Sequence, residues 1–349
     1  MEKKKIGVIF GGMSTENQVS VVSGKNVLEN MNKEKYDIYP IYIDKNGIWY
    51  EYIGKYKDLE MEKTPEKIKK IENIMEYLLQ FDVVFPILHG LYGEDGTIQG
   101  MLELLQVPYV GCKVLSSSVG MDKVYTKVIF DKAGINQTKS VYIKRTKDKY
   151  VYVKDNFDEL IMQLDEICKE IEKEINYPMF VKPSNSGSSV GITKVKSVEE
   201  LKYAIEEAGK YDNKILIEQG IDGIEVECAV LGNQEVIAGE IGEIKPADEF
   251  YSYDAKYNNK KSKTVIPAHI PQETKQEIKK LAIKAFKAID GKGLSRVDFF
   301  VENKTGKVYL NEINTMPGFT QISMYPKLME AYGIQYKELI DKLINLATE

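Results

Sequence analysis

Cysteine, histidine and tryptophan are scarce in this chain of 349 residues, which has three cysteines, two histidines and one tryptophan. The cysteines, Cys112, Cys168 and Cys228, lie far apart without paired spacing. This pattern fits neither a disulfide framework nor a zinc site. We interpret the three as reduced thiols and expect a cytoplasmic protein.

Long apolar runs and an excess of positive charge are also lacking. The first residues, MEKKKIGVIFGG, pass from lysines through a short apolar run into glycines, which fits neither a signal peptide nor a membrane span. The net charge is −5, so there is no global electrostatic reason to expect a nucleic-acid partner. We expect neither a membrane nor a nucleic acid as a partner, and an anionic ligand must meet local positive charge.

The composition that remains is ordinary for a folded protein, with 43% hydrophobic and 29% charged residues. The length suffices for two or three packed units. The pattern predicts a first α/β unit that ends near Cys112. Its expected elements are strands at 4–10, 37–43 and 83–88, a helix from about Ser14 and a second helix over 68–78.

Two further α+β units are expected after the first. Apolar residues at helical spacing over 157–171 predict a helix, and the strand YPMFVKP follows it. Alternating or continuous apolar runs then predict four strands, and two amphipathic stretches predict helices. These strands lie at 225–231, 235–242, 295–301 and 307–313, and the helices at 275–289 and 336–346.

Two of these strands carry residues that suit a magnesium site. In an extended strand alternate side chains share a face, so Arg296 lies beside Asp298, and Glu312 lies beside Asn314. Two carboxylates and an amide are ligands that suit Mg²⁺, and an arginine beside them can stabilise a transferring phosphoryl group. The alternative is a solvated antiparallel hairpin with alternating polar residues.

A loop of small residues, KPSNSGSSVG, follows Lys182 and could wrap phosphate oxygens with its backbone N–H groups. It matches neither the dinucleotide fingerprint nor the Walker pattern, so a flexible turn is the alternative. Lys123 could also meet a phosphate, Glu218 an adenine and Glu225 a ribose. Taken singly, each is more often a surface charge.

Polar residues also follow strands of the first unit, where ligands of open α/β sheets gather. Glu16 comes just after the glycines of GGMSTE, and His89 and Glu94 follow an apolar strand in LHGLYGEDGT. A lone histidine is more often a structural group than a catalyst, so this observation leaves its role open.

Together these segments resemble the D-alanine:D-alanine ligases of the ATP-grasp superfamily, in the same order along nearly the whole chain. The resemblance implies an α/β (α+β) fold of three domains, with an N-terminal open α/β domain over 1–112 and ATP-grasp subdomains over 113–220 and 221–349. The segments are GGMSTENQVSVVSG, FPILHGLYGEDGTIQGMLEL, VGCKVLSSSVGMDK, VKPSNSGSSVGI, LIEQGIDGIEVECAVLG, FYSYDAKY, SRVDFF and LNEINTMPGFTQISMYPKL.

The resemblance also implies roles for individual residues. ATP would be held by Lys123, Lys182, Ser189, Glu218, Ile221 and Glu225, and Lys256 would close over the γ-phosphate. Two Mg²⁺ ions would be held by Asp298, Glu312 and Asn314, and Mn²⁺ is an expected substitute for them. The amino acids and the oxyanion would be met by Glu16, His89, Ser188, Tyr257, Ser323, Arg296 and the backbone N–H of Gly318.

The implied activity is ligation of two D-alanines through an acyl phosphate, as a step of peptidoglycan precursor synthesis. The resemblance further implies a homodimer, and we expect the polar segment 251–263 to act as a lid that excludes water. Tyr257 together with Met324 favours D-alanine as the second substrate. The alternatives are a D-alanine:D-serine ligase and a non-catalytic ATP-binding regulator.

Overall fold

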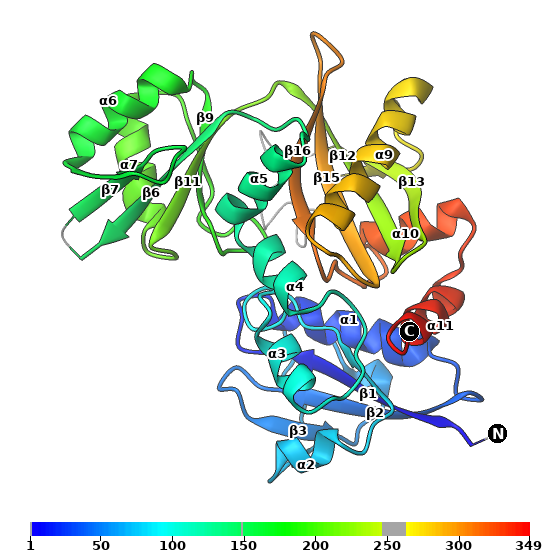
Figure 1. The fold of residues 1–349 in the computed structure, drawn as a ribbon. Coiled ribbons are helices and arrows are strands. Elements are labelled where there is room, and N and C mark those ends of the chain that lie inside the picture. The colour runs from blue at the N-terminus through cyan, green and yellow to red at the C-terminus, as the bar shows by residue number, and fades with distance from the viewer. Residues whose placement is uncertain (1, 148, 246–262) are drawn as a thin grey trace.

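Three β-sheets organise the chain in a computed structural model that describes residues 2–147, 149–245 and 263–349 (Figure 1). The first sheet has the order β4-β3-β2-β1-β5, with β1, β2 and β5 parallel and β3 and β4 antiparallel to their neighbours. Its strands are β1 (Lys4–Gly11), β2 (Tyr36–Ile43), β3 (Trp49–Tyr52), β4 (Ile68–Lys70) and β5 (Val83–Pro86).

Helices cover both faces of the first sheet, which explains why β1 is a continuous apolar run rather than an alternating one. Val8 and Phe10 belong to a core with α1 and α11, whereas Ile9 belongs to a separate core with α2 and α3. We call this sheet with α1 to α3 the first unit. The elements are α1 (Asn17–Asn30), η1 (Tyr56–Asp58), α2 (Ile74–Leu78), α3 (Thr97–Leu104) and α11 (Tyr336–Leu346).

The prediction of a helix over 68–78 is mostly wrong. Residues Ile68–Lys70 form the edge strand β4, and the helix there is only α2. Asn73 caps it by accepting a hydrogen bond from the backbone of Glu76, so the helix begins after that residue. Of the apolar residues at helical spacing, Ile68 therefore lies in β4, Met75 and Leu78 lie in α2, and Ile71 lies between the two elements.

The second sheet is antiparallel throughout and has the order β10-β9-β11-β6-β7-β8. Helices α6 and α7 pack against it around one core, and we call this assembly the second unit. Its elements are β6 (Ser140–Thr146), β7 (Lys149–Val153), β8 (Glu159–Met162), α6 (Leu164–Glu174), β9 (Met179–Pro183), β10 (Thr193–Val195), α7 (Val198–Ala208) and β11 (Lys214–Gln219).

The helix expected over 157–171 begins later than its periodicity indicates. A capping box between Gln163 and Glu166 starts α6 at Leu164. The preceding apolar residues form β8, which pairs with β7 at the sheet edge. Leu160 and Ile161 are exposed there, so their helical spacing does not reflect a shared buried face.

The third sheet is antiparallel and has the order β14-β13-β12-β15-β16. Helices α9 and α10 cover its opposite faces: Cys228 and Val230 share a core with α9, while Ala229 and Leu231 share one with α10. We call this sheet with α9 to α11 the third unit. Its elements are β12 (Gly223–Gly232), β13 (Val236–Lys245), β14 (Lys263–Val265), α9 (Gln272–Ala288), β15 (Leu294–Glu302), β16 (Val308–Asn314) and α10 (Met324–Tyr332).

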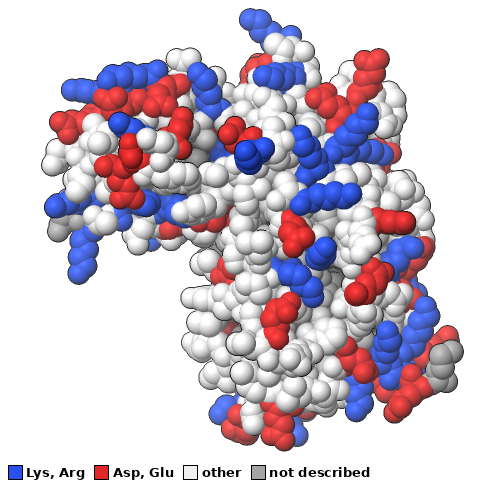
Figure 2. Space-filling model, viewed as in Figure 1, with Lys and Arg blue, Asp and Glu red and all other residues white. Residues whose placement is uncertain are grey.

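The first and third units share one hydrophobic core, because α10 and α11 contribute to the same cluster as β1 and α1. Helices α4 (Val114–Met121) and α5 (Lys123–Lys132) run from the first unit towards the second, which projects to one side (Figure 1). Charges of both signs are interspersed on the face seen in Figure 2 and are dense over the second unit. Of the described helices, none combines the length and apolarity that crossing a membrane requires.

Candidate active site

A cavity of about 410 Å³ lies where the three units meet. The first unit lines it with Glu16, His89 and Glu94, and the loop after β9 adds Ser186 to Ser189. Further lining residues come from α5 and from the third unit: Lys123, Arg296, Glu312, Asn314, Gly318, Ser323 and Met324.

Glu16 stands at the start of α1 and is only 6% exposed. Ser188, from the loop after β9, donates a hydrogen bond to its Oε1. The backbone passes so close that a Cβ on Gly187 would lie 2.4 Å from Glu16 Oε2. Ser188 and Ser189 both have positive φ, at 49° and 60°, so this loop holds an uncommon conformation beside the carboxylate. A buried carboxylate at this position suits an ammonium ligand.

His89 and Glu94 lie beside Glu16 and carry opposite pKa shifts. Burial lowers the pKa of His89 to about 4, so its imidazole is neutral at physiological pH. Burial, together with the nearby charge of Glu16, raises the pKa of Glu94 to about 8. Glu94 accepts backbone hydrogen bonds from Gly90 (2.9 Å) and Met316 (3.1 Å). The site therefore limits the negative charge next to Glu16.

The three expected magnesium ligands and Arg296 come together through the pairing of β15 with β16, which places Arg296 opposite Asn314 and Asp298 opposite Glu312. Arg296 forms a forked ion pair with Asp298, with Nε to Oδ1 at 2.8 Å and the second nitrogen to Oδ2 at 2.7 Å. Its Nε also lies 3.0 Å from Glu227 Oε2. Since Asp298 is 2% exposed, the guanidinium compensates a deeply buried charge.

The donor chemistry fits a hard divalent cation. Among the described residues no group of three or more His, Cys, Asp or Glu could hold a metal ion. Asn314 donates through Nδ2 to Asp298 (3.0 Å), so its Oδ1 is the atom that could ligate a cation. The expected set of two carboxylates and one amide leaves coordination positions for water and phosphate oxygens, as Mg²⁺ requires.

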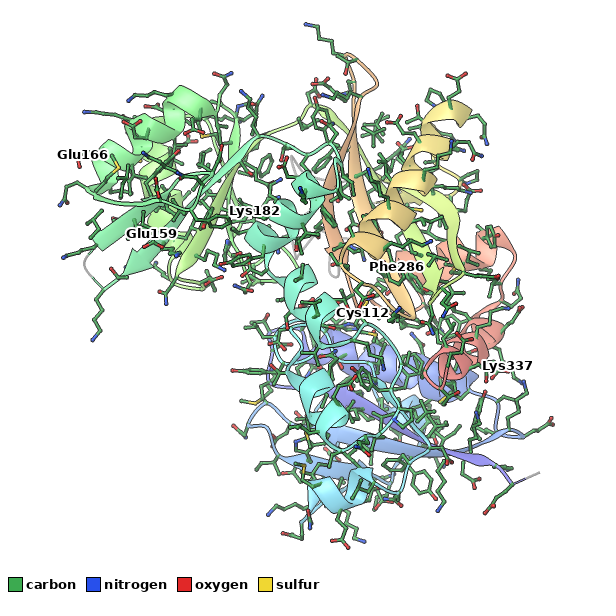
Figure 3. All side chains as sticks on the ribbon, viewed as in Figure 1. Cys112, Glu159, Glu166, Lys182, Phe286 and Lys337 are labelled. Atoms are coloured by element: carbon green, nitrogen blue, oxygen red, sulfur yellow. The ribbon has the colours of Figure 1, made fainter. Side chains whose placement is uncertain are left out.

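Lysines gather on the side of the cavity next to the second unit. Lys182 on β9 and Lys127 on α5 form ion pairs with Glu218 on β11, at 2.5 and 2.7 Å. Burial would raise the pKa of Glu218, but the two lysines hold it well below its usual range. Figure 3 shows Lys182 where the second unit approaches α5. Lys123 donates to Ser186 O (2.7 Å) and lies 3.9 Å from Glu312 Oε2.

The other residues expected to contact ATP are more scattered. Ser189 lines the main cavity, Ile221 lies between β11 and β12, and Glu225 lies on β12. A small cavity of about 10 Å³ adjoins Lys182 and Glu218 and shares Lys123 and Glu312 with the main one. The lysine cluster and the carboxylates of the third unit are thus neighbours.

Ser323 and Gly318 close the end of the cavity at α10. Ser323 precedes α10, and its Oγ accepts a hydrogen bond from the backbone of Thr320 (2.9 Å). A Cβ on Gly318 would lie 2.8 Å from Ser323 Oγ, so the absence of a side chain allows this approach. Met324 is 5% exposed and packs in the core. Lys256, Tyr257 and the lid segment up to residue 262 lie outside the described residues.

Three residues at this site were missed by sequence reasoning. Lys127 lies one helical turn after Lys123, a spacing that could have indicated it. Glu227 alternates with Glu225 on β12, but only the pairing with β15 brings it opposite Asp298. Ser23 contacts His89 across 66 positions of sequence, and no local pattern signals that contact.

Comparison with known proteins decides the family. Residues 5–112 match the family model described as D-ala D-ala ligase N-terminus, and residues 129–345 match the D-ala D-ala ligase C-terminus model. The chain belongs to the D-alanine:D-alanine ligase family. The D-alanine--D-alanine ligase of Caldicellulosiruptor bescii is 50% identical over 100% of this chain and 96% of that protein. The D-alanine--D-alanine ligase of Clostridium acetobutylicum is 51% identical over 99% of this chain and 98% of that protein.

Solved structures of the family have the same fold. The VanG D-Ala:D-Ser ligase from Enterococcus faecalis has a TM-score of 0.85 at 40% identity. The superposition covers 99% of this chain and 100% of the VanG chain. The D-alanine-D-alanine ligase from Coxiella burnetii has a TM-score of 0.83 at 34% identity, with 99% and 94% covered. These likenesses confirm the expected α/β ATP-grasp architecture.

Proposed function

We propose that this family member is an ATP-dependent ligase that joins two D-alanines into a dipeptide for peptidoglycan synthesis. The observation that carries the proposal is one cavity with two kinds of charged group. Glu16, which suits an ammonium, lines the same space as Arg296 and the carboxamide and carboxylate oxygens around it. An amino acid bound between them has its carboxylate directed towards the cationic side.

The lysine cluster supports a polyanionic co-substrate, as ATP is. Lys123 and Lys182 would meet its phosphates together with Ser189 and Lys256, and Glu218, Ile221 and Glu225 would meet the nucleoside. Asp298, Glu312 and Asn314 would hold two Mg²⁺, or Mn²⁺ in their place. When bound, the metal would neutralise phosphate charge during transfer.

The reaction begins as a carboxylate oxygen of the first D-alanine attacks the γ-phosphorus of ATP, and ADP leaves. The amine of the second D-alanine then attacks the acyl carbon of the acyl phosphate, loses a proton, and inorganic phosphate leaves. Arg296 and the Gly318 N–H would stabilise the oxyanion in this second step. Ser188 and Tyr257 would lie near the attacking amine, and Ser323 would bind the carboxylate of that amino acid.

A second candidate function is ligation of D-alanine to D-serine. It is favoured by the likeness to the VanG D-Ala:D-Ser ligase from Enterococcus faecalis, at 40% identity. One hydroxyl on the second substrate separates the two activities, and small changes in the pocket suffice for that discrimination. Against this candidate, the buried Met324 beside Ser323 favours an apolar side chain on the second amino acid.

Three broader features belong to the same proposal. The domains would span 1–112, 113–220 and 221–349, the protein would act in the cytoplasm as a homodimer, and the segment 251–263 would form a lid. A non-catalytic ATP-binding regulator is disfavoured because the Arg296, Asp298 and Asn314 hydrogen bonds are all present.

The test is an assay of phosphate release and of products by mass, with Mg-ATP and D-alanine, D-serine or L-alanine. We expect D-alanyl-D-alanine from D-alanine alone, and the same dipeptide as the main product when D-serine competes at equal concentration. A D-alanyl-D-serine product in excess would favour the second candidate. ATP binding without dipeptide from any of these amino acids would contradict both.

A further inference from the structure

The loop that carries Gly318 is held by side chains of the first unit. This loop follows β16 in the third unit, and the four backbone groups of Met316 and Phe319, on either side of Pro317-Gly318, each have a partner there. The contacts are Met316 N to Glu94 Oε2 (3.1 Å), Met316 O to His89 Nδ1 (3.1 Å), Phe319 N to Ser23 Oγ (3.2 Å) and Phe319 O to Asn26 Nδ2 (3.3 Å).

These contacts fix the direction of a hydrogen-bond chain. Met316 O can only accept, so Nδ1 of His89 carries the hydrogen. A neutral imidazole then has a bare Nε2, which accepts from the hydroxyl of Ser23 at 2.9 Å. Ser23 Oγ in turn accepts from the backbone N–H of Phe319. The low pKa of His89, about 4 because of its burial, keeps the ring neutral and the chain intact.

Both ring nitrogens of His89 are therefore engaged with the protein itself. His89 also lines the cavity, and its expected place close to the first amino acid stays a prediction. The two partners of its ring lead to the peptide groups that flank Gly318. Pro317 has no N–H group and Gly318 no side chain, so this short stretch depends on its neighbours for its orientation.

Resting on the proposed function, we propose that Ser23 and His89 are positioning residues that aim the Gly318 N–H at the oxyanion of the reaction. Ser23 and Glu16 belong to the same helical segment, since Glu16 directly precedes α1 (Asn17–Asn30). One rigid element would thus carry the ammonium site of the first D-alanine and the support of the oxyanion donor. Displacement of such a donor by about 1 Å can lower a rate about 100-fold.

Helix α1 offers a matched control for a test of this role. Ser20 and Ser23 are both 0% exposed, and each hydroxyl makes two hydrogen bonds. Ser20 Oγ accepts from Gly11 N (2.8 Å) and donates to Ile87 O (2.6 Å), both within the first unit. Ser20→Ala and Ser23→Ala therefore remove the same group from the same helix, but only the second removes a contact to the Gly318 loop.

The experiment compares kcat, the KM for each substrate and the Tm of the full-length variants. We expect both variants to lose a similar amount of Tm, whereas Ser23→Ala lowers kcat about 10-fold to 100-fold and Ser20→Ala changes it by less than about 2-fold. KM for ATP stays within about 2-fold in both. Ser23→Ala also weakens binding of a tetrahedral phosphinate analogue of the dipeptide, while Ser23→Thr, which keeps the hydroxyl, restores part of kcat.

Equal kcat in the two alanine variants, or a change confined to KM, would overturn the inference. If Ser23→Ala does not fold, His89→Gln is measured against Ser20→Ala in the same way, with the same expected difference in kcat. The proposed function is tested separately by the wild-type protein. If the wild type forms no dipeptide, that function fails, whereas an active wild type with unaltered Ser23→Ala kinetics refutes only the positioning role.

Discussion

At the scale of residues, several buried charges of the site are compensated by an oppositely charged neighbour. Arg296 compensates Asp298 and Glu227, and two lysines compensate Glu218. Removal of one partner from such a pair leaves an uncompensated charge and typically costs about 3 to 5 kcal/mol of stability. Activity losses on mutation of these residues therefore need a stability measurement beside them.

His89 provides a prediction about pH. Its pKa of about 4 in the folded protein lies below its ordinary value of 6.5, so between these pH values the unfolded chain takes up a proton that the folded protein does not. The stability that His89 contributes thus falls as the pH decreases from 6.5 to 4. Glutamine at this position does not titrate.

We therefore expect the Tm difference between wild type and His89→Gln to narrow as the pH is lowered across this window, and to be constant above pH 7. Differential scanning calorimetry in steps of half a pH unit measures it. Because Glu94 and Arg296 are present in both proteins, their own titrations largely cancel. A difference that does not vary with pH would show that His89 is not held in the neutral form.

Sequence alone predicted the residues whose relation is local. Arg296 and Asp298 are two positions apart on a strand, so their common face follows from the alternation of side chains. The partners of Glu218 could not be predicted in this way, because Lys127 reaches it only after α5 docks against the second sheet. The same holds for Ser23, whose role depends on contact between separate units.

At the scale of elements, strand assignments were most accurate for the neighbouring strands β15 and β16, although β16 lies at the edge of the third sheet. The expected strands at 295–301 and 307–313 correspond to β15 and β16 within about one residue. Assignments failed where an edge strand preceded a helix, as at β4–α2 and β8–α6. These two strands have only three and four residues, so a helical spacing of their few apolar residues arises by chance.

The packing of α10 on β13 gives a prediction for one element. A Cβ on Gly242 would lie 2.1 Å from Met324 Cε and 2.9 Å from Leu328 Cδ2. Gly242→Ala should push the start of α10 away from the sheet and displace Ser323 with it. We expect a loss of about 1 to 3 kcal/mol of stability, as overpacked cores show, and a higher KM for the second amino acid.

Steady-state kinetics with the two D-alanine sites resolved, together with chemical denaturation, measure both effects. Gly306→Ala is a suitable control because no atom lies within 4 Å of a Cβ there, although its φ of 71° adds some strain. A KM for the second D-alanine that is unchanged in Gly242→Ala would indicate that Ser323 does not depend on the position of α10.

At the scale of the whole molecule, the site exists only because three units meet. The first unit contributes the carboxylate of Glu16, which suits an ammonium. The second contributes the loop after β9, which could wrap phosphate oxygens, and the third contributes Arg296 and the oxygens that could ligate a cation. The shared core of α1, α10 and α11 fixes the first and third units relative to each other. The order of motifs along the chain predicted this architecture. It did not predict which backbone groups of the third unit are contacted by side chains of the first.

In the proposed reaction, the molecule activates the carboxylate of one D-alanine as an acyl phosphate. The most direct measurement uses D-alanine labelled with ¹⁸O in its carboxylate, Mg-ATP and mass spectrometry of the released phosphate. We expect transfer of one ¹⁸O atom from each activated carboxylate to inorganic phosphate, in step with dipeptide formation. Dipeptide formed with unlabelled phosphate would contradict it.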